Sequence, residues 1–156
     1  MSKQLAPYPE KLANCMVNYQ FLEEGLRFCL YRCQTLIHLR ISSSLSYEVP
    51  LKSIDEAALP RLIELFKPFS RNESLIQKLR LVNNHRDSLA HEGGLVQGGD
   101  NRPENEKALE AFLLEAEQCA AMIKEEAVYI DEQVGQEYRR LKQDKALPEI
   151  DIIPPL

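Results

Sequence analysis

An arginine interrupts the apolar side of a predicted helix in the segment NNHRDSLAHEGG, residues 83–94. On a helical wheel of residues 71–92, at about 100° per residue, Arg86 falls near the middle of an apolar cluster formed by Leu75, Leu79, Val82, Leu89 and Ala90. Burying an unpaired guanidinium costs several kcal/mol or more. Arg86 must therefore meet a carboxylate, a cavity, a ligand or a subunit interface.

The histidine of the same segment is the natural acid or base. His91 follows Arg86 by five residues, about 140° around an ideal helix, so one straight helix does not aim both side chains at one atom. Gly93 and Gly94 should end the helix, and frayed geometry there could turn His91 toward Arg86. Alternatively, a two-fold partner could bring its own helix alongside, so that both chains line one cleft. The dipole at a helix C-terminus favours a protonated imidazole near neutral pH, which suits acid–base work on a phosphate.

Other polar side chains share the side of the wheel on which His91 lies, namely Arg80, Asn84 and Asp87. Asp87 stands four residues before His91, so its carboxylate could hold the imidazole by a hydrogen bond. Basic charge is concentrated here: residues 67–91 carry five basic and two acidic side chains, 5 − 2 = +3, although the whole chain has a formal net charge of −5. Residues 104–156 carry six basic and thirteen acidic side chains, 6 − 13 = −7.

A purely structural interpretation of these residues stays open. Arg86 could pair with an acidic residue of the first predicted helix, such as Glu23 or Glu24, or extend its charged end to solvent. His91 could be an ordinary residue at a helix end, and the polar side of the wheel could simply face solvent.

The elements that position these residues are predicted to be helices. Apolar residues recur at helical spacing over 10–41, which predicts a long amphipathic helix. A loop with Pro50 follows over 42–52. The sequence SIDE (53–56) has the form of a capping box, and Pro60 predicts that the helix after it is short, kinked or in two parts, ending near Phe66.

A second capping box, SRNE (70–73), predicts a helix to about Glu92, and the four glycines of 93–103 predict a loop. The last helix should begin near Pro103 and run for about 35 residues, roughly 50 Å, so that its end projects or packs on a partner. No segment has the pattern of a strand. We therefore expect an all-α, antiparallel bundle of four to five helices over residues 1–145, followed by a proline-containing tail over 146–156.

The composition and the cysteine and histidine spacing indicate where the protein is located and which cofactors it could bind. The first ten residues lack the pattern of a signal peptide, and no apolar run approaches membrane-spanning length, so we expect a cytoplasmic protein without a membrane partner. Four cysteines should be free thiols there. Cys29 and Cys33 lie four apart and could share a metal, but both fall on the apolar stripe, which favours core packing. The histidines lack metal-binding spacing, so we expect no metal or other cofactor.

The segment RDSLAH (86–91) resembles the R-x4-6-H motif of the HEPN superfamily. In that family the residue after the arginine is usually Asn, Asp or His, and a small residue often precedes the histidine; here these are Asp87 and Ala90. The helical pattern fits too, as does an acidic pair on the long first helix, in FLEEGLR (21–27). The resemblance covers residues 8–140.

The resemblance implies a homodimer with a composite active site on its two-fold axis. Many members are metal-independent endoribonucleases that act as toxins, in phage defence or in RNA processing, often beside a nucleotidyltransferase antitoxin. Arg86 would then bind the scissile phosphate, and His91 would transfer a proton as the ribose 2′-OH attacks, leaving a 2′,3′-cyclic phosphate. Asp87 would orient its neighbour, and Lys78, Arg80 and Asn84 would bind RNA.

The sequence departs from one subgroup of the family, in which the antitoxin modifies a tyrosine two residues after the motif histidine. That position is Gly93 here, which puts that regulation, and a partner of that type, in doubt. Other members have lost catalysis, so the alternative function is that of a non-catalytic helical adaptor or regulator.

Overall fold

The computed structural model describes residues 8–92 and 102–145, and these form five helices without a strand. They are α1 (Tyr8–Ile41), α2 (Leu51–Asp55), α3 (Leu59–Phe66), α4 (Glu73–Glu92) and α5 (Arg102–Gln143). The predicted all-α bundle is confirmed, but its two longest helices, α1 and α5, run parallel rather than antiparallel as expected. The predicted loop at 93–103 and tail at 146–156 lie, apart from Arg102 and Pro103, outside the described residues. None of the helices in the described ranges is both long and apolar enough to cross a bilayer.

The long elements begin and end close to the predicted positions, whereas both predicted capping boxes are wrong. Ser53 lies inside α2, which begins directly after Pro50, and α3 has Pro60 in its first turn, where no amide donor is needed. This part of the chain therefore forms two short helices, α2 and α3, which agrees with the predicted two-part helix. At α4, Asn72 replaces Ser70 as the cap, because its Oδ1 accepts a hydrogen bond from the Leu75 amide at 3.1 Å.

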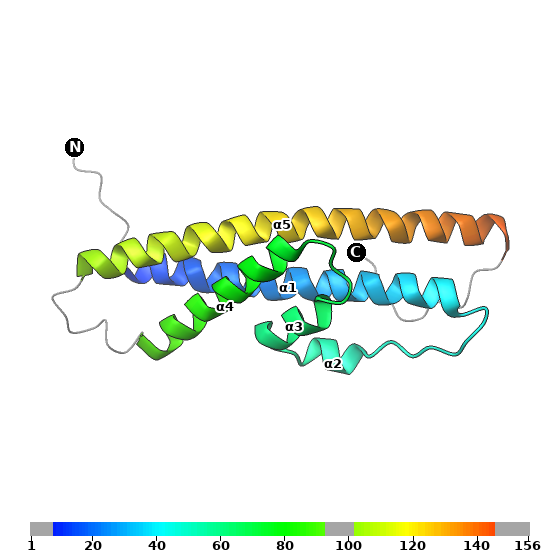
Figure 1. The fold of residues 1–156 in the computed structure, drawn as a ribbon, viewed down its shortest axis with the longest axis horizontal. Coiled ribbons are helices and arrows are strands. Elements are labelled where there is room, and N and C mark those ends of the chain that lie inside the picture. The colour runs from blue at the N-terminus through cyan, green and yellow to red at the C-terminus, as the bar shows by residue number, and fades with distance from the viewer. Residues whose placement is uncertain (1–7, 93–101, 146–156) are drawn as a thin grey trace.

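The two longest helices run parallel and side by side, as Figure 1 shows. The ion pairs between them show the direction, because the residue numbers of the partners increase together along both helices. Lys11 Nζ is 2.6 Å from Glu110 Oε1, and Arg32 Nε is 3.0 Å from Asp131 Oδ1. At Gly25 the helices approach closely, since a Cβ atom there would lie 2.7 Å from Cγ2 of Ile123. The intervening short helices return the chain to the starting end and make the parallel pairing possible.

The shorter helices cover the middle of one side of this pair. Helix α4 crosses it obliquely, running antiparallel to α1 and α5, with α3 beside it (Figure 1). Apolar side chains of all five helices form the main core, which includes Leu22, Leu26, Ile54, Leu62, Phe66, Leu79, Val82, Ala116 and Cys119. Toward the C-terminal ends of the long pair, a separate cluster contains Leu39, Val134 and Leu141.

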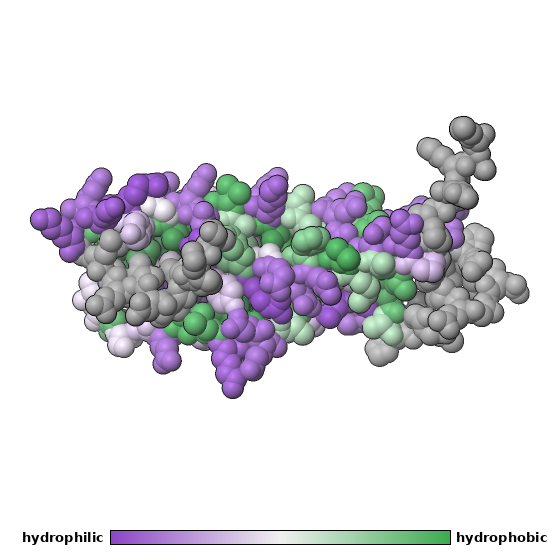
Figure 2. Space-filling model, turned by 180° about the vertical axis from the view of Figure 1, so that it is seen from behind, coloured by the Kyte–Doolittle hydropathy of each residue, from purple (hydrophilic) through white to green (hydrophobic). Residues whose placement is uncertain are grey.

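The back of the molecule carries apolar side chains scattered among polar ones, as the space-filling view in Figure 2 shows. The long helices expose several large apolar residues, namely Met16, Val17, Phe21, Leu114, Val128, Tyr129 and Tyr138. Single exposed apolar residues are normal on a protein surface. They do not by themselves mark a binding face.

Candidate functional site

Arg86 lies on the inner side of α4, as the apolar residues around it on the helical wheel predict. Leu79 and Val82 are fully buried, and Arg86, one turn further on, keeps 32% of its side chain exposed. Leu89 is partly buried, but Ala90 is exposed, contrary to the wheel. The reason is the oblique crossing, which carries the last turns of α4 away from the long pair (Figure 1). Arg86 therefore sits where the interior gives way to solvent.

The nearest carboxylate to Arg86 belongs to the acidic pair of α1. One guanidinium nitrogen of Arg86 is 3.4 Å from Oε1 of Glu23, whose side chain is only 18% exposed. The other Glu23 oxygen is 3.6 Å from Arg27, which also binds Glu24 at 2.6 Å and the Ala57 carbonyl at 2.8 Å. The pairing that the structural interpretation anticipated is thus present, and it links α4, α1 and the connection between α2 and α3.

A tyrosine near this network was not predicted as a site residue. Tyr19 is 2% exposed, and its hydroxyl has no hydrogen-bond partner among the described residues. Burial raises the pKa of Tyr19, while the positive charge of Arg86 opposes that rise. Tyr19, Glu23 and Arg27 are spaced four residues apart, so they share one face of α1. That spacing is the signal by which the sequence could have revealed them.

The residue before Arg86 faces the other long helix. The imidazole of His85 stacks on Phe112 of α5, with ring centroids 4.0 Å apart and the planes 17° from parallel. Its Nδ1 is buried and lacks a partner among the described residues. Burial lowers the pKa of His85, although the nearby Glu115 acts in the opposite direction. His85 is therefore a packing residue of the α4–α5 contact, kept neutral by its surroundings.

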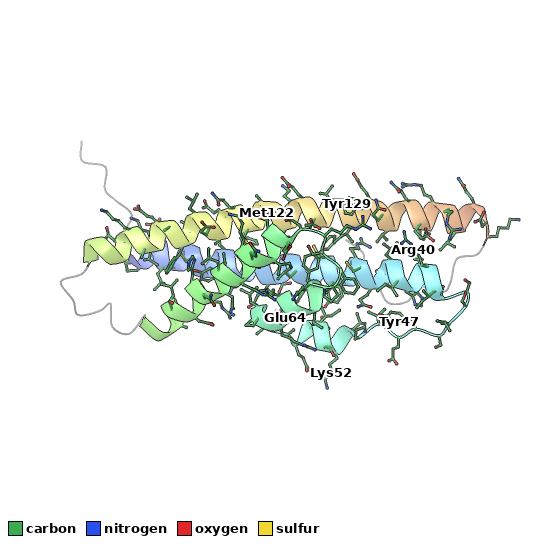
Figure 3. The ribbon with its side chains drawn as sticks, viewed as in Figure 1. Arg40, Tyr47, Lys52, Glu64, Met122 and Tyr129 are labelled. Atoms are coloured by element: carbon green, nitrogen blue, oxygen red, sulfur yellow. The ribbon has the colours of Figure 1, made fainter. Side chains whose placement is uncertain are left out.

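The basic residues predicted to bind RNA point toward different helices. Lys78 reaches α5, where its Nζ is 3.5 Å from Glu115 and 3.2 Å from Gln118. Arg80 reaches α3, where its guanidinium is 3.0 Å from Glu64, a residue labelled in Figure 3. The bond from Arg80 lowers the pKa of Glu64. Each of these cations already has a carboxylate within the chain.

The remaining predicted residues lie toward the end of α4. Asn84 and Asp87 are exposed, on the polar side that the wheel assigns to them. His91 belongs to the last turn of α4, but its side chain lies outside the described residues, as do Gly93 and Gly94. The structure therefore brings Arg86 together with Glu23, and the geometry between Arg86 and His91 stays a prediction.

A basic pocket lies beside Arg80. Its volume is about 350 Å³, and Lys67, Arg71 and Arg80 line it together with Glu73. Arg86 is not among its lining residues. The basic segment predicted from the sequence is thus divided, with Arg80 facing this pocket and Arg86 facing the interior of the bundle.

The cysteines belong to the core. Cys29 and Cys33 are buried, and burial raises the pKa of each to about 12, which keeps both thiols protonated. Core packing, the interpretation favoured by the apolar stripe, is confirmed. Within 8–92 and 102–145, no three His, Cys, Asp or Glu side chains converge as metal ligands.

Comparisons with known proteins assign no family. A scan against protein-family models, a search of curated proteins and a search of solved structures each found no match. The resemblance of RDSLAH to the HEPN motif therefore stays a prediction from the sequence.

Proposed function

We propose that the chain is a metal-independent endoribonuclease of HEPN type that acts as a cytoplasmic homodimer, in a toxin, phage-defence or RNA-processing role. Arg86 and His91 of both copies would line one composite site on the two-fold axis. The observation that carries the proposal is the position of Arg86. It lies inside an apolar stripe, yet a third of its side chain reaches solvent and one carboxylate, 3.4 Å away, is its ion-pair partner.

The guanidinium of Arg86 has donors to spare for a phosphate. An arginine carries five N–H donors, and Glu23 divides its two oxygens between Arg86 and Arg27. A phosphate could therefore bind Arg86 while Glu23 keeps Arg27 as its partner. The low exposure of Glu23 also supports a pre-positioned guanidinium, because a held side chain loses little further freedom when the substrate binds.

The proposed reaction uses groups on the substrate and on α4. The ribose 2′-OH attacks the adjacent phosphorus while the neutral imidazole of one copy's His91 takes its proton. The 5′-oxygen of the next nucleotide then leaves with a proton donated by the protonated His91 of the other copy. Arg86 stabilises the charge that develops on the phosphate oxygens. Asp87, four residues before His91, orients the imidazole. The products are a 2′,3′-cyclic phosphate and a 5′-hydroxyl, and the substrate's own hydroxyl makes a metal unnecessary.

RNA would extend along the basic part of α4, with Lys78, Arg80 and Asn84 contacting its backbone. Lys78 and Arg80 would then exchange the carboxylates of Glu115 and Glu64 for phosphates. Binding of this kind weakens steeply with added salt. A protein partner such as an antitoxin fits a toxin role, although a partner that modifies a tyrosine would meet Gly93 at the corresponding position.

The test is cleavage of several RNAs in EDTA, with analysis of the product ends. Wild type should leave cyclic-phosphate ends, and Arg86→Ala and His91→Ala should each reduce the rate by a factor of about 10² or more. Arg61→Ala is the matched control, since Arg61 is an exposed arginine of α3 outside the motif, and its rate should be unchanged. Equal cleavage by all four proteins would reject this site.

A specific observation favours a second function, that of a non-catalytic adaptor. Arg86, Glu23 and Arg27 join α4 to α1 and to the Ala57 carbonyl, which is what a structural brace requires. In that role Arg86→Ala disrupts the dimer or the fold, and no RNA is cut by wild type. Light scattering on wild type and on Arg86→Ala separates the two functions. An intact mutant dimer without nuclease activity supports the enzyme.

A further inference from the structure

A second pocket lies away from the motif, between the long helices and the turn that joins α3 to α4. Its volume is about 510 Å³, within the range of small-molecule sites. Figure 3 labels Tyr129 on α5 and Arg40 on α1, two of the residues that line it. Arg86 is not one of them, so this pocket is independent of the proposed nuclease site.

The inner wall of the pocket is apolar. Ile130 is buried, and Leu36 and Ile37 of α1 are partly buried beside it. Two aromatic rings stand closer to the opening, with Phe69 37% exposed and Tyr129 51% exposed. A hydrocarbon chain or ring in this space would remove apolar surface from water, which is the main favourable term in small-ligand binding.

Two arginines from different elements line the same pocket. Arg71, in the turn before α4, is exposed, and no ion pair within the described part of the chain includes it. Arg40 of α1 is 4.0 Å from Glu137, a carboxylate that Arg140 holds more closely at 2.6 Å. By contrast, Arg27, Arg32, Arg80 and Arg86 each have a carboxylate within 3.6 Å.

One carboxylate, Glu126, also lines the pocket, next to Cys33 and with Gln133 on the same helix. Its charge contributes to the raised pKa of Cys33, after burial. Two guanidinium groups and one carboxylate leave an excess of one positive charge. The occupant that matches this wall therefore carries a single negative charge, and a hydroxyl or amide on its body could donate to Glu126.

We propose that this pocket binds a small organic monoanion, with a carboxylate at Arg40 and Arg71 and an aliphatic or aromatic body against Ile37, Ile130 and Tyr129. The carboxylate matches the fork of a guanidinium, which can donate two parallel hydrogen bonds to it. The apolar body supplies affinity, and the charge supplies the preference for an anion. The proposal does not depend on nuclease activity.

The experiment is calorimetric titration of the full-length protein with three probes. Octanoate has both the charge and the apolar body, 1-octanol has only the body, and inorganic phosphate has only charge. Octanoate should bind at one site, about tenfold or more tighter than either of the others. Equal binding of octanoate and octanol would mean that the pocket adsorbs apolar groups without recognising an anion. If octanoate did not bind, the proposed site would be rejected.

Variants locate the binding within the molecule. Arg71→Gln and Arg40→Gln should each weaken octanoate about tenfold without affecting octanol. Gln133→Trp should fill the pocket and abolish octanoate binding while the helical circular dichroism stays unchanged. Arg61→Gln is the matched control, because Arg61 is exposed but does not line the pocket. Octanoate binding that is unaltered in all three pocket variants would place the ligand elsewhere and overturn the proposal.

Discussion

Two parts of the parallel pair α1 and α5 are packed differently. Where α3 and α4 cover the pair, buried side chains of all the helices form one large cluster. Toward the C-terminal ends of both long helices, Leu39, Val134 and Leu141 form a separate and much smaller cluster. The covered part therefore supplies most of the apolar burial that stabilises the fold.

The arginines differ in how closely they are paired with carboxylates. In the covered part, Arg27 and Arg86 have carboxylate partners within 3.6 Å, because a cation shielded from water by several helices must be paired. Arg40 and Arg71, which line the larger pocket, are exposed and have no carboxylate closer than 4.0 Å among the described residues, whereas Arg140 near the end of α5 is exposed but paired with Glu137 at 2.6 Å. Arginines that brace the fold are thus separated from arginines able to bind a ligand. Arg86, paired but one-third exposed, is the residue at which both roles meet.

The largest expected difference between the two parts is in the cost of removing a leucine. Leu79→Ala, at a fully buried position of α4, should lower the free energy of unfolding by about 3 kcal/mol. Leu141→Ala removes the same atoms from the last turns of α5, where the site can relax, and should cost about 1 kcal/mol. Urea unfolding measures both, and equal losses would mean that the outer cluster is as tightly packed as the main core.

The sequence predicts the covered part well, because helical periodicity there reports burial directly. Leu75, Leu79 and Val82 are buried as the wheel predicts, and α1 and α4 end at the predicted residues. The parallel direction of α1 and α5 could not be predicted, since periodicity gives a buried face but not the helix that covers it. The predicted capping boxes are wrong because Asn72 caps α4 in place of Ser70, and because α2 begins directly after Pro50, before Ser53.

The candidate site was predictable only in part, for a similar reason. The sequence marks Arg86 as misplaced and names Glu23 as a possible partner, and the two side chains do meet. It gives no reason to expect that Lys78 and Arg80 pair with α5 and α3, because those contacts depend on how α4 crosses its neighbours. The larger pocket combines residues from three separate segments, so no local sequence pattern could predict it.

The two glycines within long helices sharpen the comparison. Gly25→Ala should destabilise the protein by about 1 kcal/mol, because its Cβ would lie 2.7 Å from the buried Ile123 side chain and the resulting strain exceeds the gain in helix propensity. Gly135→Ala, in the outer part, meets only the flexible end of Arg139 at 3.4 Å and should stabilise by about 0.5–1 kcal/mol. Thermal unfolding of both variants is the measurement. A stabilising Gly25→Ala would show that the long helices can separate there.

The ion pair of Arg86 should contribute no more than either of these glycine substitutions changes the stability. In a double-mutant cycle of Arg86→Met and Glu23→Gln, we expect a coupling energy of about 0.5–1 kcal/mol. The matched pair is Arg80 with Glu64, at a similar 3.0 Å but about half exposed, for which a smaller coupling energy is expected because solvent screens the charges. Chemical unfolding at low salt measures both cycles. A stronger coupling for the exposed pair would contradict the idea that enclosure by several helices gives the Arg86 pair its strength.

The smallest expected effect concerns the pH dependence of the α4–α5 contact. Burial lowers the pKa of His85 below its ordinary value of 6.5, so the unfolded chain takes up a proton at a higher pH than the folded chain does. The stabilising contribution is fully present above pH 6.5 and is lost as the pH falls through the lowered pKa. His85→Phe keeps a ring on Phe112 but removes the titration.

We expect wild type to lose more stability than His85→Phe between pH 7.5 and 5.5, as measured by urea unfolding at both values. The comparison is made within each protein, so a constant difference in packing between histidine and phenylalanine cancels. Identical losses in the two proteins would mean that His85 is accessible enough to be protonated without cost. The stack on Phe112 would then be a surface contact, and the region around Arg86 would be more open on its α5 side than the burial of Nδ1 implies.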